Sequence, residues 1–381
     1  MKDLLIASGQ DGREKALSRF LAKLLDVGAV DALVVPVEAA PGVITHVLAK
    51  DPRLVEEAAR PLAPVMPSSA ATLVSEVVRK RPSGRVAALL RPCEARALVE
   101  LVKLKQAAPE NVVAIGMDCA GTYDPVAYRQ AAGNVDGLEF REACRVCQNP
   151  APLEDGLPGI TLGLIGLDDS EGIVMSVHER LDPAVAAVME ELGLASGEGA
   201  GRKRREAVQA LVQERQEACD AFLKGARRGA ATAEGPDPAA PGVSGVPGVP
   251  GIGAFARELA ACTGCHNCRV ACPVCYCREC VFDTDTFEHE TGQFLRWAGR
   301  KGALKMPSET MLYHLTRMNH MSLSCVGCGQ CEQACPAHLP IFRLFAMASR
   351  RTQELFGYVP GRSLDDELPF TTFREQELEP R

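Results

Sequence analysis

The 381-residue sequence predicts an α/β domain with a parallel sheet at residues 1–228, followed by an all-α domain at 254–360. Three observations support this division. In the first part, apolar runs of strand length alternate with amphipathic stretches of helical length, as in strand–helix–strand units. A segment rich in Ala, Pro and Gly follows at 229–253. After it the apolar residues recur at helical spacing, and residues 361–381 are predicted to form a C-terminal tail.

The elements expected in the first domain are helices at 11–25, 68–80 and 94–105, and strands at 32–37, 85–90 and 112–117. The clearest unit is the apolar strand that ends at Leu90, the amphipathic helix after it, and the strand that starts at Val112. Two strands joined by one helix and a short return are expected to be parallel neighbours. A highly charged helix is expected at 202–228.

Residues 229–253 are predicted to be a flexible linker. The stretch contains repeated Gly and Pro between Gly242 and Gly251, a composition that forms neither helix nor sheet and buries little surface. Its glycines do not indicate a dinucleotide-binding loop, because no strand precedes them.

One cysteine spacing occurs twice after the linker. Each copy reads Cys-x-x-Cys-x-x-Cys-x-x-x-Cys-Pro, first at 262–273 and again at 325–336. In proteins that hold two [4Fe–4S] clusters, three such cysteines bind one cluster and the fourth, before proline, binds the other. The spacing therefore predicts one cluster on Cys262, Cys265, Cys268 and Cys335, and a second on Cys325, Cys328, Cys331 and Cys272. The alternative is a pair of zinc sites, although these usually combine two separated Cys-x-x-Cys pairs.

The segment between the two motifs is long, and its apolar residues have helical spacing at 286–301 and 308–321. A further helix is expected at 341–356. This arrangement resembles the all-helical dicluster ferredoxins, such as the iron–sulfur domain of succinate dehydrogenase and the small subunit of heterodisulfide reductase. The resemblance implies an all-α domain around two [4Fe–4S] clusters.

A third set of cysteines lies in the first domain. Cys93 and Cys119 follow the ends of two strands that are expected to be neighbours, and ligands in α/β sheets collect at that edge. Cys144 and Cys147 form a Cys-x-x-Cys pair downstream. Four cysteines suffice for a third [4Fe–4S] cluster. The alternative is that Cys93 and Cys119 are small buried core residues.

Several runs in this domain, at 90–98, 116–121, 141–147 and 160–166, resemble the beta subunit family of coenzyme F420-reducing hydrogenase and formate dehydrogenase. The resemblance implies that Cys93, Cys119, Cys144 and Cys147 bind a cluster. It also implies FAD, which exchanges hydride with coenzyme F420 and single electrons with iron–sulfur clusters. No glycine-rich fingerprint is present, so the sequence assigns no flavin-binding residue.

The charge and the cysteine count exclude some classes of function. Acidic residues outnumber basic residues by 49 to 42, so nucleic acid is not an expected partner. No apolar run is long enough for a transmembrane segment, and the first residues lack a signal-peptide core, so a cytoplasmic location is expected. In that reducing compartment the 16 cysteines are expected to be ligands rather than disulfides.

These features predict an iron–sulfur electron-transfer subunit of a cytoplasmic redox complex of the formate dehydrogenase, hydrogenase or heterodisulfide-reductase type. We expect no catalytic residue, because no nucleophile–base pair and no nickel or molybdenum motif accompanies the cysteines. The catalytic subunit is the expected partner. One alternative is a self-sufficient flavin oxidoreductase, and another is a non-redox zinc-binding scaffold. A role in lining a cluster is expected for Cys275, Cys277 and Cys280.

Overall fold

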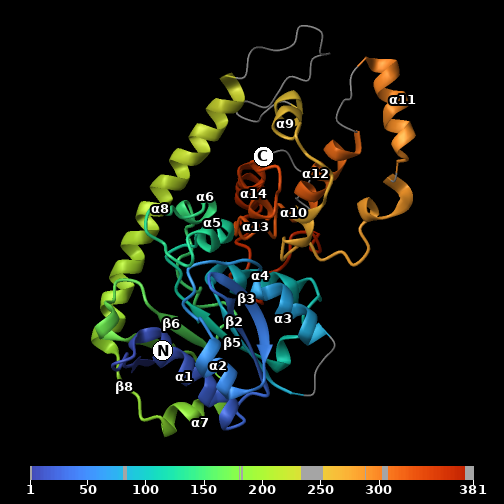
Figure 1. Ribbon diagram of the computed structural model, residues 1–381. Coiled ribbons are helices and arrows are strands. Elements are labelled where there is room, and N and C mark those ends of the chain that lie inside the picture. The colour runs from blue at the N-terminus through green and yellow to red at the C-terminus, as the bar shows by residue number, and fades with distance from the viewer. Residues whose placement is uncertain are drawn as a thin grey trace.

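The structure is a computed structural model that describes residues 2–79, 84–179, 181, 183–232, 252–287, 289–302 and 308–373. A twisted sheet with helices on its faces forms one end of the molecule, and a group of helices from the C-terminal half forms the other (Figure 1). The predicted linker lies largely outside the described residues. None of the described helices is long and apolar enough to cross a membrane.

The sheet has eight strands in the order β3-β2-β4-β5-β6-β7-β1-β8. The strands are β1 (Lys2–Ile6), β2 (Ala32–Ala40), β3 (Val43–Ala49), β4 (Val86–Leu90), β5 (Val112–Met117), β6 (Ile160–Gly163), β7 (Ile173–Val177) and β8 (Ala195–Ser196). The neighbours β2, β4, β5 and β6 are parallel, as predicted for β4 and β5. The remaining pairs are antiparallel. The expected parallel sheet is therefore confirmed for the central strands, whereas the sheet as a whole is mixed.

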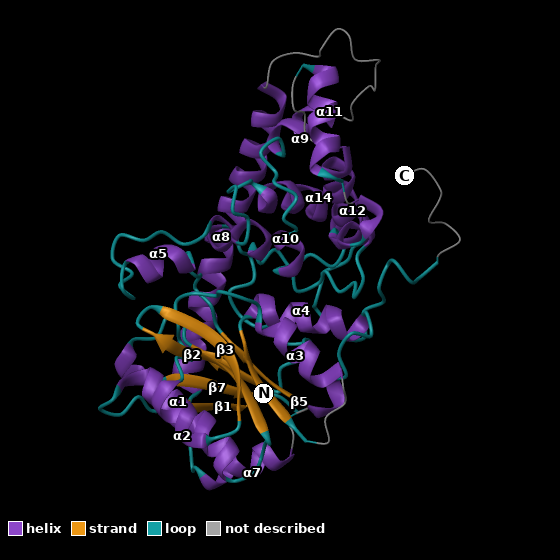
Figure 2. Ribbon diagram, turned by 45° about the vertical axis from the view of Figure 1, so that its right-hand side comes forward, coloured by secondary structure: helices purple, strands orange, loops and turns teal. Residues whose placement is uncertain are grey.

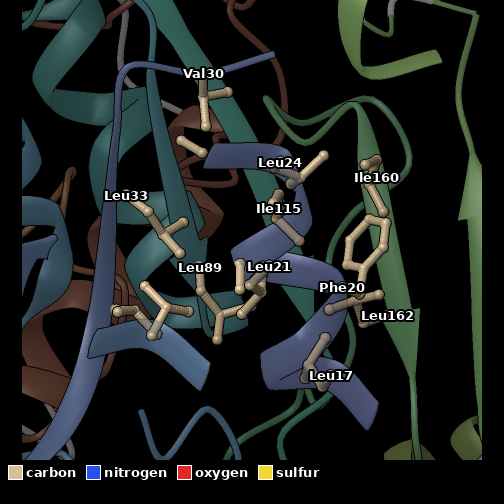
Figure 3. Packing of buried hydrophobic residues seen from close by; sticks show 14 of the residues in the cluster. Leu17, Phe20, Leu21, Leu24, Val30, Leu33, Leu89, Ile115, Ile160 and Leu162 are labelled. Atoms are coloured by element: carbon tan, nitrogen blue, oxygen red, sulfur yellow. The ribbon is translucent and has the colours of Figure 1, made fainter. Parts of the chain in front are cut away.

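The helices of the first part are α1 (Gly12–Asp26), α2 (Pro52–Ala58), α3 (Ala70–Arg79), α4 (Pro92–Lys103), α5 (Pro125–Gln130), α6 (Glu142–Arg145), α7 (Pro183–Glu191) and α8 (Glu198–Thr232), with 3-10 turns η1 (Pro109–Asn111) and η2 (Asp169–Glu171). Successive side chains of β4 point to opposite faces of the sheet, as the two-residue period of a strand requires. Leu89 packs with Leu17 and Leu21 of α1 on one face (Figure 3). Ala88 packs with Leu98 of α4 on the other.

The elements assigned after residue 251 are helices: α9 (Ile252–Glu258), α10 (Asn267–Val270), η3 (Val281–Asp283), η4 (Asp285–Phe287), α11 (Thr291–Lys301), α12 (Ser308–Met321), α13 (Gln330–Gln333) and α14 (Ile341–Phe356). They lie above the end of the sheet that α4 covers (Figure 2). That these helices form a dicluster ferredoxin domain, and that the domain boundaries lie where expected, stay predictions.

The two parts share one hydrophobic core. Buried residues of α3 and α4, such as Val74 and Leu98, belong to the same cluster as Phe255, Tyr313 and Leu344 of the C-terminal helices. The long helix α8 begins beside the sheet and runs up to the C-terminal helices (Figure 1). This shared core brings cysteines from both halves of the sequence to the boundary between the two parts.

Candidate metal centres

The two repeated motifs form the same loop. In the first motif, Gly264 and His266 have left-handed backbone conformations, with φ of 67° and 56°. The matching positions of the second motif, Gly327 and Gly329, have φ of 73° and 68°. Each loop leads into a one-turn helix, α10 or α13, that carries the third cysteine of its motif. The repeated spacing in the sequence therefore corresponds to a repeated local structure.

The first group of cysteines consists of Cys262, Cys265, Cys268 and Cys335. All four line one pocket, together with Tyr313 and His314 of α12. Burial raises the pKa of the Cys262 thiol, and the three other cysteines raise it further. Cys335 comes from the second motif, so the structure brings together the set that the spacing predicts. Cys265 is exposed, which places this group at the molecular surface.

The second group consists of Cys272, Cys325, Cys328 and Cys331. Burial raises the pKa values of the Cys272 and Cys331 thiols above that of a free cysteine. It raises the pKa of the Cys328 thiol to about 11. Cys272 comes from the first motif, yet its thiol is close enough to Cys325 and Cys328 to interact with them electrostatically. The fourth cysteine of each motif thus lies with the other motif's three.

The third group consists of Cys93, Cys119, Cys144 and Cys147. Cys93 lies in the first turn of α4 and Cys119 follows β5, so both stand at the carboxyl edge of the sheet. The backbone N–H of Cys119 donates to the Pro150 carbonyl at 2.8 Å, which ties this edge to the loop after Cys147. Cys93 interacts electrostatically with both Cys119 and Cys147.

Arginines compensate part of the cost of burying thiolates in the third group. Burial raises the pKa of Cys119 to about 11, and raises that of Cys93 and Cys147. Burial also acts on Cys144, but Arg141 and Thr122 outweigh it and hold the pKa of that thiol below its usual value. Arg141 donates to the Cys144 sulfur at 3.6 Å.

The donor sets fit [4Fe–4S] clusters. Each group offers four cysteine sulfurs, which is the ligand set of such a cluster. Among the described residues, no three His, Cys, Asp or Glu side chains are arranged to hold a single metal ion. A cubane occupies the space between its ligands, so its thiolates stand further apart than those around one ion. Binding by these twelve cysteines stays a prediction.

Several polar side chains also surround these sulfurs. Arg317 of α12 donates to the Cys268 sulfur at 3.1 Å. The Tyr313 hydroxyl lies 3.4 Å from the same sulfur, and His314 Nε2 lies 3.4 Å from the Cys262 sulfur. Burial lowers the pKa of His314 to about 4, so its ring is neutral near pH 7. The helical spacing of 308–321 indicated the helix, but only the fold shows which of its faces meets the cysteines.

Three further cysteines, Cys275, Cys277 and Cys280, follow the first motif. In the described part of the chain, no fourth cysteine joins them to make another group of four. Cys275 lies near Arg317 and Cys277, and Cys277 is exposed. Cys280 accepts a hydrogen bond from Arg269. Their role in lining a cluster stays a prediction.

Comparison with known proteins first gives the class. Residues 321–339, which contain the whole second motif, match the model of a 4Fe-4S binding domain. The loop of the second motif is thus similar to iron–sulfur binding domains.

Two relatives then show what the whole chain resembles. The chain is 23% identical over 322 residues to F420-dependent formate dehydrogenase subunit beta of Methanocaldococcus jannaschii, covering 75% of each chain. It is 26% identical over 394 residues to F420-dependent formate dehydrogenase 1 subunit beta of Methanococcus maripaludis, covering 93% of this chain and 92% of that protein. The resemblance to this family of beta subunits is confirmed. A chain of the F420-reducing [NiFe] hydrogenase complex from Methanosarcina barkeri aligns with a TM-score of 0.44 and 12% identity, over 63% of this chain and 97% of that one.

Proposed function

We propose that this chain is the electron-transfer subunit of a larger redox complex and that each of its three cysteine groups binds one [4Fe–4S] cluster. The observation that carries the proposal is the grouping itself. Cysteines from positions 93 to 335 lie in three sets of four, and members of each set pack against the apolar cluster that the two parts share. Metal ligands must be deprotonated, and buried thiolates need a counter-charge that bound iron supplies.

The residues around each group have the roles expected of an electron-transfer site. A [4Fe–4S] cluster takes up and gives back single electrons at a potential set by hydrogen bonds to sulfur and by exposure. Arg317, Tyr313 and Arg141 place donors next to sulfur. The cysteines of the second and third groups are all partly buried, whereas Cys265 of the first group is exposed. The first group is therefore the proposed point of contact with the redox partner.

The relatives suggest the nature of that partner. Both are named as beta subunits of formate dehydrogenase, so each works with at least one other subunit. We propose a catalytic redox subunit as the partner of this chain, of the formate dehydrogenase, hydrogenase or heterodisulfide-reductase type. Cysteine groups without a nucleophile–base pair fit a conduit for electrons rather than a site of bond-breaking chemistry.

A cavity at the carboxyl edge of the sheet is the proposed site for FAD, which would exchange hydride with F420 and single electrons with the clusters. The cavity has a volume of about 360 Å³ and is lined by Gly12 at the start of α1, by Ala63, by Arg13 and Arg60, and by the carboxylates Asp11, Glu14, Glu38 and Asp169. The chain continues from Ala63 to Met66, whose sulfur lies 4.0 Å from that of Cys93. A flavin here would lie next to the third group. The names of the relatives include F420 dependence, which supports an exchange of hydride with F420 by this chain.

Anaerobic purification of the full chain tests the clusters. Iron and acid-labile sulfide per chain are expected to be about twelve each for three groups, and about eight each for two. Cys93→Ala should remove about four irons and leave the electron paramagnetic resonance signals of the C-terminal pair. A colourless protein with zinc and no sulfide would overturn the proposal in favour of a scaffold.

Flavin content tests the cavity separately. Arg60→Ala is expected to lower the bound flavin per chain without changing iron, because Arg60 lines the cavity. Arg53→Ala is the matched control, since that side chain is 84% exposed and lies on α2. Equal flavin content in both variants would place the flavin elsewhere. Steady reduction of a small substrate by the purified chain alone would instead favour a self-sufficient oxidoreductase.

A further inference from the structure

Arg317 lies between the first and second cysteine groups. Its side chain is buried, with 4% of the residue exposed, between the rings of Tyr313 and Phe345. One guanidinium nitrogen donates to the Cys268 sulfur at 3.1 Å and another to the Cys268 carbonyl at 2.9 Å. The same guanidinium also interacts electrostatically with two members of the second group, Cys272 and Cys331. Among the described residues, Arg317 forms no ion pair with a carboxylate.

Arg96 occupies the equivalent place between the second and third groups. It lies on α4, one turn after Cys93, and 6% of the residue is exposed. Its guanidinium donates to the Val326 carbonyl at 3.1 Å, within the loop between Cys325 and Cys328. It interacts electrostatically with Cys93 and Cys147 of the third group and with Cys325 of the second.

The charge of a buried arginine is permanent and needs a negative neighbour. Arginine keeps its proton in proteins, and a buried unpaired charge is costly. Cysteine-ligated clusters carry negative charge, and each added electron makes that charge more negative. Because the surroundings are apolar, a cation next to sulfur favours the reduced state more strongly than it would in water.

We propose that Arg317 and Arg96 are charge-compensating residues at the two junctions, each favouring reduction of both clusters that flank it. This inference rests on the proposed function. The second group then benefits from both arginines and is the relay between the other two. When an electron passes between neighbours, one cluster is oxidised and the next is reduced, and no proton has to move because the guanidinium stays charged.

Redox titration of the full chain, followed by electron paramagnetic resonance, tests the inference. Signals are assigned with Cys265→Ser, Cys325→Ser and Cys119→Ser, one for each group. Arg317→Gln is expected to lower the reduced-to-oxidised ratio about tenfold at the first and second groups, a shift of about 59 mV to more negative potential. The third group should not move.

Arg96→Gln is expected to shift the second and third groups in the same direction and to leave the first in place. Arg317→Lys and Arg96→Lys keep the positive charge, so their shifts should be smaller. Arg343→Gln is the matched control, because Arg343 lies on neighbouring α14, is paired with Glu258 at 3.1 Å and should shift no signal.

The outcomes separate this inference from the proposed function. Absence of iron and sulfide in the unmodified chain would overturn the function. Bound clusters whose potentials are unchanged in the Gln variants, or shifted at other groups than those named, would overturn the inference alone. Loss of iron in a Gln variant but not in the Lys variant supports a need for the charge. Loss in both shows that the guanidinium is needed for its shape, which overturns the inference.

Discussion

At the residue scale, one glycine determines how closely the second motif approaches the α/β part. Gly329 has φ of 68°, and a Cβ atom there would lie 2.4 Å from the Cβ of Ala143, next to Cys144. The second cysteine group and the third can thus approach only because position 329 has no side chain. Gly327, two residues earlier, has φ of 73° and nothing within 4 Å of a built Cβ. Substituting these two glycines in turn therefore separates the energetic cost of a packing clash from the cost of a left-handed backbone conformation.

Gly329→Ala is expected to destabilise the protein more than Gly327→Ala. Both substitutions force alanine into a left-handed conformation, at about 1–2 kcal/mol. Only Gly329→Ala adds a clash, which costs about 1–3 kcal/mol more in a packed site. Chemical unfolding followed by circular dichroism measures both losses. Equal losses would contradict the close approach to Ala143.

His46 should make stability depend on pH. Burial lowers the pKa of His46 below its usual 6.5, although Glu94 opposes this. The unfolded chain therefore binds a proton near pH 6.5 that the folded chain resists, so the free energy of unfolding falls as pH decreases below that value. Between about pH 7.5 and 5.5, wild type should lose more stability than His46→Phe. Equal losses would show that another group dominates.

At the element scale, α8 fastens the sheet to the cysteine loops. Arg204 of α8 makes two hydrogen bonds to Asp118, at 2.8 and 2.6 Å, directly before Cys119. Further along the helix, Arg215 donates to the carbonyls of Ala120 and Cys144. Closer to the end of the helix, Phe222 stacks on Phe342 of α14. Helix α8 thus holds the backbone around Cys119 and Cys144 of the third group in place.

Arg204→Met is expected to destabilise the protein by about 3–5 kcal/mol, because it leaves the buried Asp118 carboxylate without its partner. The double variant with Asp118→Asn should recover part of this loss, since no charge is then left unpaired. Thermal unfolding of the three proteins measures it. Lys203→Met is the control, because its ion pair with Glu171 is exposed, and it should cause no measurable change. A comparable loss there would contradict the assignment.

The sequence predicted the central unit of the sheet but missed its edges. The apolar runs at 85–90 and 112–117 and the amphipathic stretch between them were sufficient to place β4, α4 and β5. The strand expected to end at Val37 instead continues to Ala40 and turns back through Gly42, with φ of 70°, into β3. Half-polar edge strands carry weaker periodicity, and their pairing depends on neighbours that are distant in the sequence.

At the scale of the whole molecule, the segment that follows α14, residues 358–361, packs against α4 of the first part of the chain. Glu100 of α4 is fully buried and accepts hydrogen bonds from the Tyr358 hydroxyl at 2.6 Å and the Gly361 N–H at 2.8 Å. Arg96, one turn earlier, donates to the Pro360 carbonyl at 2.9 Å. Residues that are far apart in the sequence therefore hold the two parts together beside the second cysteine group.

Tyr358→Phe is expected to lower the free energy of unfolding by about 1–3 kcal/mol, because it removes a donor from a buried carboxylate. Tyr276→Phe is the control, since Tyr276 is 37% exposed and its change should have little effect. Urea unfolding of the two variants measures the difference. A negligible effect of Tyr358→Phe would show that the tail is not anchored through this hydroxyl.

The spacing of the cysteines after residue 261 was sufficient to predict two groups of four, because ligand spacing follows from the short loops that wrap a cluster, whereas the third group was predicted from two strand ends and a family resemblance. The placement of Arg317, Arg96 and Tyr358 was decided only by the tertiary structure. Their partners lie far away in the sequence, and an isolated arginine or tyrosine on a helix has no local pattern that tells a charge near sulfur from a charge in solvent. Cysteine ligands repeat at short, regular intervals in the sequence, whereas the charges around them depend on which distant elements pack into the same core.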